Sequence, residues 1–162
     1  MLMAAIGMQA QSLLGTWKTT VDEEGQKKDY YLTFAQGTLN VKVLSPITDP
    51  EMGTIVVSAQ MPYDYTRSGD LLVMKPKADE LKMGIEKMEF TDKVNVALNQ
   101  NPELKKTVED EMAKAVMKGL EAFKDQFRIE LSVFATMTIR KLTATELVLV
   151  DNEGTTTFVR VE

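Results

Sequence analysis

The sequence predicts a mainly β protein: an antiparallel up-and-down barrel of eight to ten strands with one long inserted α-helix at about 102–126. Three observations lead to this fold class. Short segments of alternating apolar and polar residues are joined by links of a few residues, as in an antiparallel meander. One stretch changes to a helical period. A tryptophan in the first segment and an arginine in the last can meet only if the sheet closes on itself.

The alternating segments define about ten strands, and turn residues separate them. Residues 45–53 hold two prolines and a glycine, so we expect a loop there. Pro62 is expected to break or bend the strand that contains it. A β-bulge is expected near Glu86, because the apolar alternation slips by one residue after Ile85. The strands are expected over residues 16–20, 28–35, 38–44, 54–61, 63–67, 71–75, 81–90, 132–142, 146–150 and 155–161.

The expected helix has a clear start and an open end. Asn101 is a good N-cap, and Pro102 suits the first helical position. An apolar stripe then follows at helical spacing and can be continued through Phe127 and Leu131, so the end of the helix is not fixed. A β-sandwich is the alternative fold, but most links are too short for its crossovers.

Composition excludes several kinds of chemistry. The chain has 162 residues and a net charge of −5 without a basic block, which argues against a nucleic-acid partner. It contains no cysteine and no histidine, so it has no thiolate or imidazole for catalysis or for a metal site. We therefore expect no enzyme, no metal and no cofactor. A carboxylate- or tyrosine-based isomerase is the one enzyme that the residue inventory permits.

Residues 1–10 are apolar and end in small residues, which is typical of the tail of a secretory signal peptide. A short buried N-terminal segment is the alternative. Ten residues are too few to cross a bilayer, so no membrane insertion is expected. The predicted organisation is a signal-peptide remnant at 1–10 and one domain at 11–162, secreted or periplasmic.

Three segments carry a family resemblance. Residues 14–18 read Leu-Gly-Thr-Trp-Lys, residues 68–72 form a Ser-Gly-Asp-Leu-Leu hairpin, and residues 141–149 look like a late hairpin. Together with a terminal arginine they resemble the lipocalin-like (calycin) domains of secreted Bacteroidetes proteins. The resemblance implies structural roles for Gly15, Trp17 and Arg160, with the indole stacked under the guanidinium at one end of the barrel.

A barrel of this kind suggests a container for a small hydrophobic molecule, held by burial alone and without catalysis. The wall candidates are aromatic or polarisable residues on the expected strands. The same side chains would equally well fill a dry barrel. The alternative function is therefore a structural or interaction module that binds a protein partner through its helix or a sheet edge. The candidate ligand-binding residues are Tyr30, Phe34, Tyr63, Tyr65 and Met83.

Overall fold

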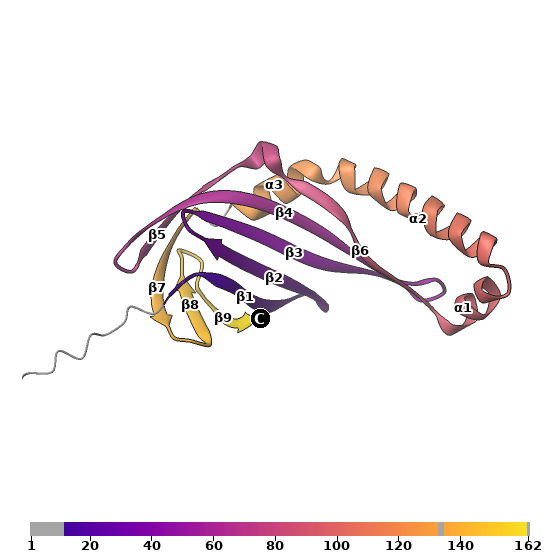
Figure 1. Cartoon of the computed structure of the whole chain (residues 1–162), viewed down its shortest axis with the longest axis horizontal. Coiled ribbons are helices and arrows are strands. Elements are labelled where there is room, and N and C mark those ends of the chain that lie inside the picture. Colours follow the sequence, from indigo (N-terminus) through magenta and orange to yellow (C-terminus); the bar gives the residue numbers. More distant parts are fainter. Residues whose placement is uncertain (1–11, 133–134, 162) are drawn as a thin grey trace, which may run out of the picture.

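A computed structural model describes residues 12–132 and 135–161, and nine antiparallel strands within them form one sheet (Figure 1). Its strand order is β3-β2-β1-β9-β8-β7-β5-β4-β6, and an additional β3–β4 pairing joins eight of the strands into a closed ring. The strands are β1 Gly15–Glu23, β2 Gln26–Ala35, β3 Thr38–Asp49, β4 Gly53–Ser68, β5 Leu71–Pro76, β6 Lys82–Phe90, β7 Thr136–Leu142, β8 Glu146–Val150 and β9 Thr155–Val161.

The closed antiparallel barrel confirms the predicted fold class. The first and last strands pair, with Trp17 opposite Arg160. The expected bulge is also present, because β6 shifts register between Ile85 and Lys87 and leaves Glu86 without an opposite residue on β4. Short links join most neighbouring strands, as the meander pattern predicts.

Strands β3 and β4 are longer than the barrel needs and extend beyond it as an arm. They pair over twelve residues each, from Thr38↔Asp64 to Asp49↔Gly53. Strand β2 covers β3 only as far as Leu44. The rest of β3, the first half of β4 and strand β6 form the three-stranded arm visible on the right of Figure 1.

Two proline-based expectations were wrong. Residues 45–49 form the end of β3 rather than a loop, and β4 runs straight through Pro62. Pro46 lies beyond the last residue of β3 that pairs with β2, so it costs no bond to that strand. Pro62 lies where β4 exchanges β6 for β5 as its neighbour, and its carbonyl accepts from the Lys77 N–H at 2.9 Å. The strand tolerates a residue without an N–H there, because neither β5 nor β6 pairs with Pro62.

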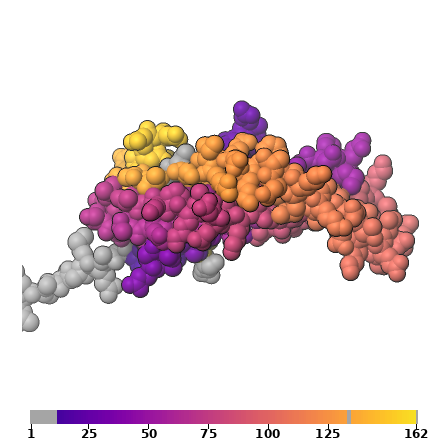
Figure 2. All heavy atoms as spheres, turned by 90° about the horizontal axis from the view of Figure 1, so that it is seen from above, coloured from indigo at the N-terminus to yellow at the C-terminus, as the bar shows by residue number. Residues whose placement is uncertain are grey.

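Three helices connect β6 to β7: α1 Asp92–Asn99, α2 Pro102–Ala122 and α3 Lys124–Ser132. The long helix is confirmed as α2, and the Asn101 side chain accepts from the Leu104 N–H at 3.1 Å as its cap. The sequence analysis missed α1, and it placed residue 132 in a strand although α3 ends there. A short 3-10 turn, η1, spans Ala78–Glu80. Figure 2 shows α2 and α3 as a band along one face of the molecule.

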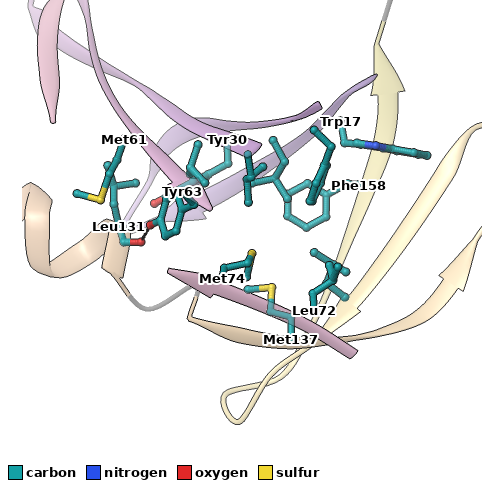
Figure 3. Packing of buried hydrophobic residues seen from close by; sticks show 14 of the residues in the cluster. Trp17, Tyr30, Met61, Tyr63, Leu72, Met74, Leu131, Met137 and Phe158 are labelled. Atoms are coloured by element: carbon teal, nitrogen blue, oxygen red, sulfur yellow. Dashed lines mark hydrogen bonds between the residues drawn. The ribbon is translucent and has the colours of Figure 1, made fainter. Parts of the chain in front are cut away.

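Apolar side chains fill the middle of the barrel. Those of β1, β4, β5 and β9 meet there, and α3 adds Leu131 from outside the ring (Figure 3). Leu131 is fully buried, and its carbonyl accepts a hydrogen bond from the Tyr63 hydroxyl. The largest fully buried side chains are Trp17, Tyr63, Phe158, Leu32, Leu39, Met61, Leu72, Leu131, Leu147, Leu149, Val41 and Val43.

Arg160 closes one end of the barrel over Trp17. Its guanidinium carbon lies 4.1 Å from the centre of the indole ring, which confirms the predicted stacking. The same guanidinium donates to the carbonyls of Ala144 at 2.7 Å, Leu14 at 2.7 Å and Ser12 at 2.9 Å. The indole N–H donates to the Leu13 carbonyl at 2.8 Å. One side chain therefore ties the start of β1 to β9 and to the β7–β8 turn.

The predicted signal-peptide remnant at residues 1–10 lies outside the described residues. None of the helices in the described part of the chain combines the length and apolar character that crossing a bilayer requires.

We expect Arg160→Lys to lower the free energy of unfolding by about 2 kcal/mol, because an ammonium cannot hold three carbonyls in a planar fork or lie flat on the indole. Urea unfolding followed by the fluorescence of Trp17, the single tryptophan, measures the change. Arg140→Lys is the matched control, since Arg140 is exposed on β7. Equal midpoints for the two variants would show that Arg160 does not hold the closure.

Two glycine substitutions are expected to have opposite effects. Gly15 has φ of +118°, and a Cβ there would lie 2.5 Å from Nη1 of Arg160, so Gly15→Ala should destabilise the fold by about 1–3 kcal/mol. Gly119 lies in α2 with nothing within 4 Å of an added Cβ. Because alanine favours a helix over glycine, Gly119→Ala should raise the free energy of unfolding by about 1 kcal/mol. Thermal unfolding of both variants tests the pair, and a stable Gly15→Ala protein would contradict the close approach.

Candidate functional site

The barrel wall is incomplete between β1 and β9, and a cavity opens there. These two strands pair through only three residues each, Thr16–Lys18 and Val159–Val161. Beyond Lys18, β1 continues with β2 alone, and β9 before Val159 pairs with β8 alone. The diverging strands leave a cavity of about 310 Å³, here called the mouth cavity. It is lined by Thr19, Val21, Glu23, Tyr30, Glu130, Glu153, Thr156 and Phe158.

The mouth cavity lies at the opposite end of β1 from the Trp17–Arg160 stack. Trp17, Thr19, Val21 and Glu23 are spaced two residues apart on β1 and therefore share one face of the strand. Trp17 is fully buried, whereas Glu23 is exposed, so this face runs from the sealed end of the barrel to its rim. Strand geometry alone therefore places successive β1 side chains along the cavity wall.

The floor and walls of the mouth cavity are largely apolar. Phe158 is 1% exposed and belongs to the core cluster, so its ring separates the cavity from the filled centre. Val21 and the ring of Tyr30 form further apolar wall, and the neutral polar residues Thr19 and Thr156 lie beside them. Apolar walls with a few polar groups are the usual composition of a small-molecule site.

Helix α3 contributes a carboxylate to the mouth cavity. Oε1 of Glu130 accepts from the Tyr30 hydroxyl at 2.9 Å and lies 3.4 Å from Nζ of Lys28. Nζ of Lys28 also lies 2.6 Å from Oε2 of Glu23. These contacts join β1, β2 and α3 at the rim. A further contact, from Nε of Arg128 to the Ala78 carbonyl at 3.3 Å, ties α3 to the 3-10 turn.

The rim contacts change the ionisation of two groups. Burial is the main cause that raises the pKa of the Tyr30 phenol above its ordinary value, and the hydrogen bond to Glu130 adds to it. Partial burial lowers the pKa of Lys28, but Glu23 and Glu130 outweigh that effect and leave the Lys28 pKa raised. Tyr30 is therefore a neutral donor and Lys28 a cation at neutral pH.

Of the five expected ligand-binding residues, only Tyr30 lines the mouth cavity. Phe34 and Tyr63 lie in the filled core, 2% and 0% exposed. Tyr65 packs edge-on against Phe34 with ring centres 5.2 Å apart, and its hydroxyl donates to the Ala35 carbonyl at 2.9 Å. Met83 packs against the core cluster from its edge. The role of these five residues in binding stays a prediction.

The sequence analysis did not single out the other residues of the mouth cavity. Two signals could have found some of them. Residues spaced by two from Trp17 share its inward face, which leads to Thr19 and Val21. The same rule leads backward from Arg160 to Phe158. Glu130 had no such signal, because its position depends on the direction in which α3 leaves α2 at Phe123.

Other hollows lie along the arm. One of about 250 Å³ lies between β2–β3 and the α2–α3 junction, and it includes Lys28, Leu120 and Phe127. Another of about 560 Å³ lies at the arm tip, between the β3–β4 turn and α1, where most lining residues are exposed. Among these hollows of the described residues, the mouth cavity joins a buried aromatic floor to polar groups from three separate elements, so we treat it as the candidate site.

No protein-family model matches the chain, and no curated protein matches it. Within residues 12–132 and 135–161, no group of three or more Asp and Glu side chains is placed to hold a metal ion. The candidate site therefore has to be interpreted from its own geometry: a mouth cavity in a closed β-barrel whose centre is filled.

We expect the fold to lose stability as the pH rises above about 10, where an unfolded tyrosine ionises. Because the pKa of Tyr30 is raised in the folded state, its contribution is fully present below the unfolded pKa and is lost on the alkaline side. Tyr30→Phe should therefore show a shallower decline in urea midpoint between about pH 9 and 11. Tyr31→Phe, at a neighbouring residue on β2, serves as control. Parallel declines for wild type and Tyr30→Phe would contradict the buried position of the phenol.

Proposed function

We propose that this protein binds a small, largely apolar molecule in the mouth cavity and performs no catalysis. The observation that carries the proposal is the cavity at the divergence of β1 and β9, with Phe158 as its floor and Tyr30 in its wall. Because the centre of the barrel is filled, the ligand sits at the mouth and does not extend along the barrel axis.

The size of the mouth cavity limits the ligand. A volume of about 310 Å³ lies at the lower end of the range for small-molecule pockets. It has room for about ten groups the size of a water molecule. At about 0.5 kcal/mol per non-hydrogen atom, such a ligand would bind with about −5 kcal/mol, a Kd on the order of 0.2 mM. Tighter binding requires a well-placed polar contact in addition to burial.

The proposed class is a lipocalin-like domain. The closed antiparallel barrel is compatible with that class, and the Gly15, Trp17 and Arg160 constellation supports it. Binding without turnover agrees with a sequence that contains no histidine and no cysteine. A secreted or periplasmic location is part of the proposal and rests on the apolar residues 1–10, so N-terminal sequencing of the protein from its native source tests it separately.

Titration with N-phenyl-1-naphthylamine, a neutral dye whose fluorescence rises in apolar surroundings, tests the binding function. We expect saturable binding to the wild type and at least tenfold weaker binding to Thr156→Trp, because the new indole would occupy the mouth cavity. Thr157→Trp is the matched control: the side chain is exposed on the opposite face of β9.

Two outcomes of the dye titration would overturn the proposal. Absence of saturable binding to the folded wild type of both the dye and naphthalene, a smaller probe with ten non-hydrogen atoms, means that the mouth cavity does not accept an apolar molecule. Equal affinity for Thr156→Trp and Thr157→Trp means that the dye binds elsewhere. Native mass spectrometry of the protein from its own source adds an independent measurement, because a retained ligand would appear as a mass increment.

A second candidate function is an interaction module that binds a protein through its helix or a sheet edge. The observation that favours it is the apolar exposure along α2 and at its C-cap, where Leu104, Met117 and Phe123 are 48%, 39% and 56% exposed. Strand β6 also ends the sheet beside β4, but its charged residues discourage pairing with another chain. Crosslinking from α2 in the native source would distinguish this function from ligand binding at the mouth.

A further inference from the structure

The charged side chains that line the mouth cavity, as far as the structure describes the chain, carry the same sign. The described residues around it include the carboxylates of Glu23, Glu130 and Glu153 and no lysine or arginine. The nearest cation, Lys28, pairs with Glu23 and Glu130 but lines the neighbouring hollow under α2 and α3. The Lys28 ammonium therefore partly neutralises Glu23 and Glu130 from the neighbouring hollow and does not line the mouth cavity itself.

One carboxylate at the mouth cavity, that of Glu153, pairs with no cation in the part of the chain that the structure describes. In the described residues, Glu153 makes no side-chain hydrogen bond or ion pair; it lies in the β8–β9 turn, where the Asp151 carboxylate accepts from the backbone N–H of Glu153 at 2.8 Å and of Gly154 at 2.9 Å. Three carboxylates against one shared ammonium leave the site with a negative field. A low-dielectric wall concentrates such a field toward the opening.

We infer that the mouth cavity selects small apolar molecules that carry a protonated amine and disfavours those that carry a carboxylate. This inference rests on the proposed function and adds the charge of the ligand. The apolar part would lie against Phe158, Val21 and the Tyr30 ring, and the ammonium would lie toward Glu130 and Glu153. An aromatic face beside the carboxylates favours a cation further.

Three probes with the same eight-carbon chain test the inference: octylamine, 1-octanol and octanoate. Each probe is titrated into the wild type bound to N-phenyl-1-naphthylamine at pH 7 and low ionic strength, and its affinity is measured from the dye that it displaces. We expect octylamine to bind about tenfold tighter than 1-octanol, and octanoate to bind more weakly than 1-octanol. The preference for the amine should narrow as salt is added, because surface charges are screened.

Single substitutions test whether the preference for octylamine over 1-octanol arises in the mouth cavity. Glu130→Gln and Glu153→Gln should each reduce the octylamine-to-octanol affinity ratio about threefold or more. If Glu130→Gln disturbs α3, Glu153→Gln still tests the inference. The Asp151 carboxylate holds the β8–β9 turn, so we expect the turn to keep its shape without the Glu153 carboxylate. Glu111→Gln is the control: it removes the same charge from the exposed surface of α2 and should leave the ratio unchanged.

The possible results separate the two proposals. If 1-octanol binds as well as octylamine, or octanoate binds best, the charge inference is wrong while the binding function stands. An equal fall in the ratio for Glu111→Gln also overturns the inference, because overall charge would then explain it. If the dye binds at the mouth and none of the three probes displaces it, the charge inference is wrong while the binding function stands; if neither the dye nor any of the three probes binds there, the proposed function itself fails.

Discussion

The fold depends on closing a ring whose two ends share only three residue pairs. A ladder of that length is a weak join, and the Arg160 guanidinium reinforces it by lying on Trp17 and donating to three backbone carbonyls. Burying the indole N–H and ordering the arginine side chain both cost free energy. The hydrogen bonds that these two side chains donate to backbone carbonyls offset this cost, because those carbonyls would otherwise lack partners. Without closure, β1 and β9 would both be exposed sheet edges.

The ring consists of two meanders, β1 to β5 and β7 to β9, and the chain between them forms η1, β6 and the three helices. They meet at β1–β9 and at β5–β7, and each junction has three residue pairs. Within the first meander the ladders are longer, up to twelve pairs between β3 and β4. The core side chains of both meanders pack together in the centre, so the mouth cavity lies beside the β1–β9 junction and not in the centre of the barrel.

Much of the fold could be predicted because half-buried strands alternate. Tyr30, Leu32 and Phe34 face the core, and their spacing alone identifies β2. The arm could not be predicted, because its strands contain Pro46 and Pro62. A strand tolerates proline at these two positions because no neighbouring strand pairs with the side that lacks an N–H, and the sequence does not reveal this. Helix α1 has eight residues, too few for a clear periodic signal. The candidate site was harder to predict than the fold. Tyr30 was among the predicted ligand-binding residues, but Glu130 was not, because only the packing of α3 against the barrel brings it to the mouth cavity.

The position of the mouth cavity along a weak junction has a consequence for its capacity. A junction held by three pairs separates locally at less cost than the twelve-pair ladder on the far side of the barrel. Arg160 anchors one end of that junction, so we expect any widening at the other end, where Thr156 and Val21 line the cavity. We therefore expect the mouth cavity to open beyond its resting volume of about 310 Å³ while the rest of the barrel wall keeps its shape.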